Sequence, residues 1–185
     1  MINNQYIVYY VFILLAAIFA YLAQVFSTRK NGEYKLNKFL YFISFSILLI
    51  LVGFRVCGVG VDDYEYKRIF NAVSVDGPIE YFLKTTLEPG YILANWLIGF
   101  FTNDFQIVLV ITTIIPLIFF YKAFELWQEK INFFLAFCLF GALMIVYFIG
   151  INRLFIAVGI FAYSLKYFLK NDRKRFNYLI LFILF

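Results

Sequence analysis

Carboxylates and arginines are the residues of this chain best suited to chemistry, and most of the carboxylates lie in one polar stretch. Residues 55–90 hold six of the eleven acidic residues, and the segments on either side are strongly apolar. A carboxylate can take a proton from a hydroxyl group as a general base, and an arginine can bind phosphate oxygens through its planar guanidinium group. The chain has no histidine, which removes the usual general base and every Ser-His-Asp arrangement. Any catalysis must therefore use carboxylates, tyrosines and cations.

Two arginines are candidates for binding an anion. Arg55 directly follows an apolar run, where an interfacial arginine that extends to the lipid headgroups is an equally good explanation. Arg153 lies in the short turn 150–153 between two apolar runs, where a cation needs an anionic partner or a bound phosphate. Pairing of Arg153 with Asp62, Asp63 or Glu88 is the structural alternative.

Asp62 and Glu88 are the candidates for a general base. Asp62 stands three residues before Glu65, which resembles a capping box at a helix start, so a helix cap is the alternative for Asp62. Glu88 precedes Pro89 and Gly90 and also suits a helix start. The helix expected there is short and apolar, however, and membrane proteins commonly build binding sites at the ends of such half-helices. For each of these two acids, the sequence leaves open whether it is a general base or a helix cap.

The composition places these candidates in a membrane protein. Apolar residues make up 64% of the chain and charged residues 15%, with a mean hydropathy of +0.86, whereas soluble domains are roughly half apolar. The net charge of +5 is carried by short loops beside apolar runs, so no nucleic-acid partner is needed to explain it. The two cysteines form no metal-binding pattern, and we expect neither a metal nor a cofactor. The predicted fold is a single all-α integral membrane domain over 1–185, a polytopic transmembrane helix bundle.

Seven apolar runs predict the helices of this bundle. The run at 6–26 has 21 residues, which span roughly 30 Å as a helix. The run at 91–101 is too short to cross a bilayer and follows a proline, so we predict a re-entrant or interfacial half-helix. The run at 176–185 is short and stops at the chain end, so we expect a chain truncated at its C-terminus. The other spans are predicted at 39–54, 105–121, 133–149 and 154–169.

The basic loops predict the orientation of the bundle. Loops 27–38 and 170–175 each carry four basic residues against one acid, and the positive-inside rule assigns them to the cytoplasm. The N-terminus and the polar stretch 55–90 are then extracytoplasmic. A half-helix at 91–101, in place of a full crossing, brings the turn 150–153 to the same outer face. The candidate acids and arginines are thereby predicted on one side of the membrane.

The polar stretch is predicted to be structured. Between Tyr66 and Val73, apolar residues recur with helical spacing, which indicates an amphipathic helix. A turn is predicted at 76–78, and residues 79–86 predict a second short helix that lies along the interface.

Three motifs, in this order and spacing within a multispanning chain, resemble the EpsG-like family of bacterial exopolysaccharide proteins, which is similar to the Wzy-type polysaccharide polymerases. The resemblance runs from about Arg55 to Lys170. The sequence departs from the family's pattern at Val61, Asp63 and Leu154, where the family typically has threonine, tyrosine and glutamine. The motifs are Arg55-x4-Gly60-Val61-Asp62-x3-Tyr66-x3-Phe70, then Glu88-Pro89-Gly90-Tyr91, then Asn152-Arg153-x3-Ala157.

The resemblance implies a polymerase of the bacterial cytoplasmic membrane that serves exopolysaccharide or capsule synthesis. It would move a growing glycan from undecaprenyl diphosphate onto a lipid-linked repeat unit at the outer face. Asp62 is then the first candidate for the base and Glu88 the second. The residues implied in substrate binding are Arg55 and Arg153, at the diphosphate, together with Tyr66 and Asn152.

The implied partners are the undecaprenyl-diphosphate-linked glycan, the lipid bilayer and other polysaccharide assembly proteins. Two other classes of function stay open. One is a non-catalytic membrane component of the assembly machinery that docks a partner through its outer acidic segment. The other is a transporter, because charged residues beside broken helices also suit a substrate pathway.

Overall fold

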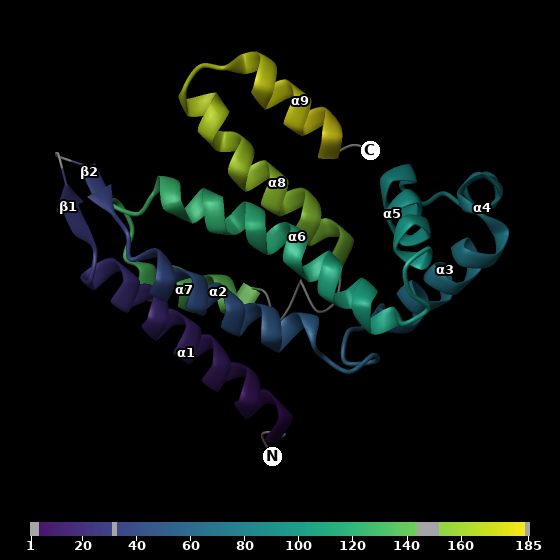
Figure 1. Cartoon of the computed structure of the whole chain (residues 1–185), viewed down its shortest axis with the longest axis horizontal. Helices are drawn as coiled ribbons and strands as arrows, with labels where there is room; N and C mark the ends of the chain where they lie inside the picture. The colour runs from purple at the N-terminus through teal and green to yellow at the C-terminus, as the bar shows by residue number, and fades with distance from the viewer. Residues whose placement is uncertain (1–3, 31–32, 144–151, 184–185) are drawn as a thin grey trace.

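The computed structural model describes residues 4–30, 33–143 and 152–183 of the chain, and most of these residues are helical (Figure 1). Three short helices gather at one end of the molecule: α3 (Asp63–Asp76), α4 (Pro78–Lys84) and α5 (Pro89–Gly99). We call this group the α3–α5 lobe. The remaining helices form a bundle: α1 (Asn4–Val25), α2 (Lys38–Gly53), α6 (Phe105–Leu126), α7 (Phe133–Leu143), α8 (Asn152–Leu169) and α9 (Arg173–Ile183). The predicted helical class is thus confirmed.

The bundle helices have the composition of membrane helices. Among the described residues, α1 and α6 are long and apolar enough to cross a bilayer, over Ile7–Val25 and Phe105–Leu126. The helices α2, α7 and α8 contain shorter apolar stretches. Each predicted span coincides with a helix to within a few residues, except that the second part of the span predicted at 133–149 lies outside the described residues.

Small and aromatic side chains fill the bundle core. In α1, which packs against α2 and α7, the side chains of Ala16, Ala17, Ala20 and Ala23 are fully buried. Small residues let neighbouring helices approach closely, and close packing drives helix association where lipid removes the hydrophobic effect. The buried aromatic side chains of the same core are Tyr41, Phe45, Phe120, Phe133, Phe137, Phe140 and Phe155.

A small antiparallel hairpin follows α1, in a segment for which the sequence predicted only a basic loop. Strand β1 (Thr28–Lys30) pairs with strand β2 (Glu33–Lys35), with Thr28 opposite Lys35. The hydroxyl of Tyr34 donates to the carbonyl of Gln24 at 2.8 Å, which fastens the hairpin to the end of α1. The hairpin therefore depends on a tertiary contact that the short polar strands do not reveal.

The α3–α5 lobe has a hydrophobic core of its own. The predicted amphipathic helix is present as α3, whose buried face contributes Tyr66, Ile69, Phe70 and Val73. The chain turns at Gly77, where a positive φ of 80° is accessible to glycine, and Pro78 then begins α4. This core also includes Phe105, Val108 and Leu109 from the first turns of α6, so the lobe packs against the bundle at that point.

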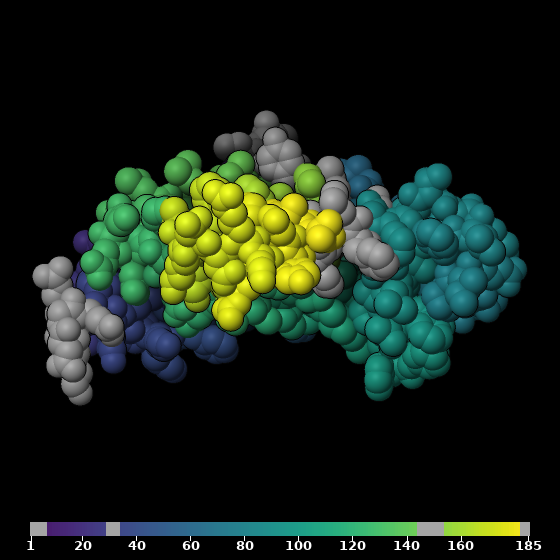
Figure 2. Space-filling view, turned by 90° about the horizontal axis from the view of Figure 1, so that it is seen from above, coloured from purple at the N-terminus to yellow at the C-terminus, as the bar shows by residue number. Residues whose placement is uncertain are grey.

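The bundle helices alternate in direction, and their connections collect at two ends (Figure 1). The hairpin, the α6–α7 turn and the α8–α9 turn lie in the left half of the view, whereas the lobe lies at the far right. Helix α5 packs against α3 and α4 within the lobe and does not lie among the bundle helices. Figure 2 shows the lobe as a mass at one end of the molecule, with α9 lying over the middle of the bundle.

Candidate functional site

A buried ion pair lies at the junction between the bundle and the lobe. Arg55 lies just after α2, and Asp63 is the first residue of α3. The guanidinium of Arg55 forms a bidentate ion pair with the carboxylate of Asp63. The Nη2 atom lies 2.7 Å from Oδ1 and the Nε atom 3.3 Å from Oδ2. The two side chains are 1% and 0% exposed. A buried pair of this kind is held only where the geometry is good and the remaining polar atoms are satisfied.

Backbone amides complete the surroundings of the Asp63 carboxylate. Its Oδ2 atom accepts hydrogen bonds from the amides of Gly58, at 3.2 Å, and Gly60, at 2.8 Å. Gly58 has a φ of 102°, a backbone conformation that other residues rarely adopt, so glycine is favoured at this position. The turn between α2 and α3 is therefore folded around the carboxylate of Asp63.

The same junction satisfies the last carbonyl groups of α2, which have no partner within their own helix. Arg55 donates from Nη1 to the carbonyl of Val52 at 2.9 Å. Gln106, in the first turn of α6, donates from Nε2 to the carbonyl of Gly53 at 2.8 Å. Arg55 thus connects the end of α2 with the start of α3, and Gln106 connects the end of α2 with the start of α6.

Asp62 occupies the N-cap position of α3, but its side chain makes no capping hydrogen bond. The capping box predicted from Asp62 and Glu65 is therefore wrong. Glu65 instead accepts two bonds from the guanidinium of Arg68, at 2.6 and 2.9 Å, and the backbone of Asp62 is not in the extended conformation that a capping side chain needs. Among the described residues, no side-chain hydrogen bond holds the half-buried carboxylate of Asp62.

Glu88 and Tyr66 lie within the lobe. Glu88 is exposed at the N-cap position of α5 and Pro89 is the first residue of this helix, as the sequence predicted. Tyr66 is 2% exposed, and its ring centroid lies 5.7 Å from that of Tyr91 in the first turn of α5. The structure therefore brings the motif containing Arg55 and the motif containing Glu88 together through the packing of α3 on α5.

Asn95 is a buried polar residue of the lobe that the sequence analysis did not select. Its side chain is fully enclosed next to the lobe core, and its Nδ2 atom donates to the carbonyl of Tyr91 at 2.8 Å. Within the described residues its Oδ1 atom has no hydrogen-bond partner.

The side chains of Asn152 and Arg153 lie outside the described part of the structure. Their backbone begins α8, which packs along α6. In Figure 1 the start of α8 points toward the lobe side of the bundle. The predicted convergence of Arg153 with the acids of the polar stretch stays a prediction.

Exposed ion pairs cover the outer surface of the lobe. Lys84 donates to Glu80 at 2.8 Å and to Asp76 at 3.2 Å, and these bonds raise the pKa of the Lys84 ammonium above its ordinary value. The hydrogen bonds to Glu65 likewise raise the pKa of the Arg68 guanidinium. These pairs are solvated and contrast with the enclosed pair of Arg55 and Asp63.

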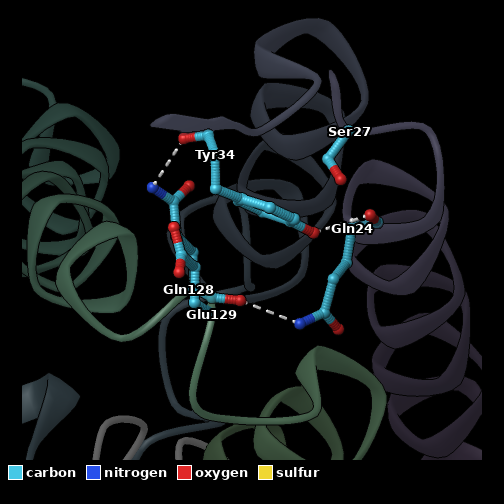
Figure 3. Close-up of a pocket in the computed structure, with 5 residues that line it drawn as sticks. All are labelled: Gln24, Ser27, Tyr34, Gln128 and Glu129. Carbon is cyan, nitrogen blue, oxygen red and sulfur yellow. Dashed lines mark hydrogen bonds between the residues drawn. The ribbon is translucent and has the colours of Figure 1, made fainter. Parts of the chain in front are cut away.

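A polar cavity of about 410 Å³ lies at the opposite end of the bundle, between the hairpin and the α6–α7 turn (Figure 3). The Nε2 atom of Gln24 donates to the carbonyls of Gln128 and Ile131 at 2.9 and 2.8 Å, and its Oε1 atom accepts from the amide of Phe133. These bonds hold the α6–α7 turn against α1. No group of three His, Cys, Asp or Glu side chains in the described residues is arranged to hold a metal ion.

From the sequence, Asp63 is predicted only as a possible partner of Arg153, and its pairing with Arg55 is not predicted. The spacing of Gly58, Gly60 and Asp63 was the available signal, because two glycine amides before a helix start can face the same carboxylate. Asp62 was selected instead because it stands in the motif that resembles the EpsG-like family, with a helix cap as the alternative.

Comparison with known proteins agrees with the resemblance seen in the motifs. No curated protein and no solved structure matches the chain. The family model of the EpsG family matches residues 38–185, which include the junction, the whole lobe and α6 to α9. This match covers most of the chain, and the protein therefore belongs to the EpsG family.

Proposed function

We propose that this chain is a membrane polymerase of polysaccharide biosynthesis, which extends a glycan carried on undecaprenyl diphosphate. Membership of the EpsG family supports a role in polysaccharide biosynthesis at a membrane. The observation that carries the finer proposal is the state of Asp62. Its carboxylate has no side-chain hydrogen bond in the described residues, while the adjacent turn is held rigidly by Arg55 and Asp63.

The proposed reaction is the attack of a sugar hydroxyl on the anomeric carbon of the carrier-linked glycan. A new carbon–oxygen bond forms, and the bond from the anomeric carbon to the diphosphate oxygen breaks. The diphosphate leaves with the electron pair, and the hydroxyl proton passes to a carboxylate. Asp62 is the proposed base, with Glu88 as the second candidate, and Asn152 is proposed to contact the substrate. The ring of Tyr66 is enclosed in the lobe core, which favours a positioning role over the substrate contact predicted from the sequence.

Arg153 and Arg55 take different parts in this proposal. A departing diphosphate needs positive charge, and the guanidinium fork of Arg153 suits two phosphate oxygens at once. The Arg55 side chain is almost fully enclosed, with Asp63 and the carbonyl of Val52 as its partners. This geometry favours a positioning role for Arg55 over the direct phosphate contact predicted from the sequence.

Replacing Asp62 by asparagine tests the base. We expect Asp62→Asn to abolish polymer formation in a complemented deletion strain while the protein stays in the membrane at its normal abundance. Glu80→Gln is the matched control, because it removes one exposed carboxylate of the same lobe. Wild-type polymer from the Asp62→Asn strain would refute the assignment, and loss of the protein itself would show a structural role.

Replacing Arg153 by lysine tests the phosphate contact. A lysine keeps the charge but offers a single ammonium in place of the bidentate fork, so we expect most of the polymer to be lost. Polymer length and yield on a gel measure the effect. Polymer of normal length and yield would remove Arg153 from the proposed site.

A non-catalytic role in the assembly machinery is the second candidate. It is favoured by large apolar side chains exposed on the lobe, such as Ile79 and Leu83 in α4, which are 77% and 79% exposed. A deletion strain distinguishes the two. Accumulation of single lipid-linked repeat units supports the polymerase, whereas a normal pool of these units with misassembled machinery supports the docking role.

A further inference from the structure

Cations from three helices gather around two tyrosine rings at the end of the bundle opposite to the lobe. The ammonium groups of Lys122, in α6, and Lys166, in α8, each lie 5.8 Å from the ring centroid of Tyr163. One turn further along α8, the guanidinium of Arg175, from α9, lies 5.8 Å from the ring centroid of Tyr167. The two tyrosine hydroxyl oxygens are 3.4 Å apart. Each of the three cations thus lies beside one of two neighbouring tyrosine rings.

The cluster carries more positive charge than its own acids can balance. Segments 122–126 and 166–175 contain six basic residues but only two acids, Glu125 and Asp172. Asp172 pairs with Arg175 at 3.3 Å. Among the described residues, neither Lys122 nor Lys166 has a carboxylate within ion-pair distance. Lys122 and Lys166, which lie beside one ring without a paired carboxylate among the described residues, favour an anionic ligand.

Exposed apolar side chains lie within one helical turn of Tyr167 and Arg175 along α8 and α9. Phe168 and Leu169, beside Tyr167 on α8, are 62% and 61% exposed, and Tyr178 on α9 is also exposed. Large apolar side chains next to a group of cations match the boundary between lipid chains and headgroups, where tyrosine is enriched. A free phosphate ion would satisfy the cations but would make no contact with these apolar side chains.

We propose that Lys122, Lys166 and Arg175, arranged around Tyr163 and Tyr167, form a binding site for the headgroup of an anionic phospholipid. The charge complementarity supports an anion, and the neighbouring apolar side chains support a lipid as its source. The site joins α6, α8 and α9, so a bound lipid stabilises their packing. It lies at the end of the bundle that carries the basic loops and is independent of the proposed glycan site.

Thermal unfolding of the full chain in a neutral detergent tests this site. A ligand that binds only the folded protein raises the unfolding midpoint. We expect phosphatidylglycerol to raise the midpoint, and equal concentrations of phosphatidylcholine or sodium phosphate to leave it almost unchanged. An equal rise with phosphatidylcholine would overturn the requirement for charge. An equal rise with sodium phosphate would assign the site to a free anion and overturn the lipid.

Variants of the basic residues then show which side chains cause the rise in the unfolding midpoint. At about 1 kcal/mol for each cation near an anionic lipid, Lys122→Gln with Lys166→Gln should weaken the phosphatidylglycerol response roughly 30-fold in concentration. Lys67→Gln with Lys84→Gln, in the lobe, makes the same charge change and should keep the full response. If the first variant unfolds early without lipid, Lys122→Arg with Lys166→Arg replaces it and should retain the response. A full response in the double glutamine variant, or none in the arginine variant, would refute the site.

Discussion

At the scale of single residues, the junction between bundle and lobe depends on which of two neighbouring acids faces inward. Asp63 is enclosed, with Arg55 and two glycine amides as its partners, whereas the carboxylate of Asp62 makes no side-chain hydrogen bond within the described part of the chain. A buried charge without a partner strongly lowers the free energy of unfolding, whereas an exposed ion pair contributes little to it. The buried pair should therefore contribute more to the stability of the junction than the exposed ion pairs of the lobe do.

Asp63→Asn should destabilise the protein strongly. The change leaves the guanidinium of Arg55 enclosed without its counter-charge, which costs about 3 kcal/mol or more in the free energy of unfolding. A lower unfolding midpoint in detergent is the expected result. A faster reaction of Cys57 with a maleimide should accompany it, in a Cys138→Ala background, because Cys57 is half-buried in the same turn.

The control for Asp63→Asn lies two residues further along α3. Glu65→Gln removes the partner of Arg68 in an exposed pair and should leave the midpoint and the Cys57 reaction rate almost unchanged. If the two variants behave alike, the turn is not held by the buried pair.

At the scale of elements, close approaches at small residues decide how the bundle helices pack. Where α6 and α8 meet, a Cβ atom on Gly159 would lie 3.1 Å from the carbonyl oxygen of Pro116 and 3.2 Å from its Cα atom. Backbone atoms cannot move aside as a flexible side chain can. The glycine therefore lets α8 lie against the backbone of α6, as small residues commonly do in membrane helix pairs.

Gly159→Leu should force α6 and α8 apart. Overpacking of this kind costs about 1–3 kcal/mol, so we expect a lower unfolding midpoint in detergent. Val158→Leu is the matched control, because it enlarges the preceding side chain of the same helix on an exposed face. Equal midpoints for the two variants would show that the close approach does not limit the packing of α8.

At the scale of the whole molecule, the alternating helices separate the chain into two ends. The basic connections lie at one end and the lobe with its acids at the other, and α5 packs in the lobe. The loop assignments made from charge, in which residues 91–101 do not complete a crossing, stay a prediction. Which end faces the cytoplasm stays a prediction of the positive-inside rule.

Cysteine labelling in intact cells measures this orientation. In a Cys57→Ser, Cys138→Ala background, a cysteine replacing Asn103, between α5 and α6, should react with a membrane-impermeant maleimide. A cysteine replacing Lys35, in the hairpin, should react only after the cells are opened. Both positions are exposed, so a difference in their maleimide reaction does not arise from burial. The reverse pattern would place the lobe in the cytoplasm and exclude a glycan site outside the cell.

The sequence by itself determined the helical class, the position of almost every helix, the amphipathic α3 and the start of α5 at Pro89. These features depend on apolar periodicity and on proline and glycine, whose effects are local to the chain. The motifs were sufficient to indicate the EpsG family, which the family match confirms.

Only the tertiary structure decided which side chains meet. Asp62 and Asp63 are adjacent residues with identical side chains. Which of them pairs with Arg55 therefore depends on the direction in which α3 leaves the turn. Lys122 and Tyr163 come together only because α6 packs against α8. Such contacts join distant segments through the geometry of packing, and no local pattern in the sequence encodes that geometry.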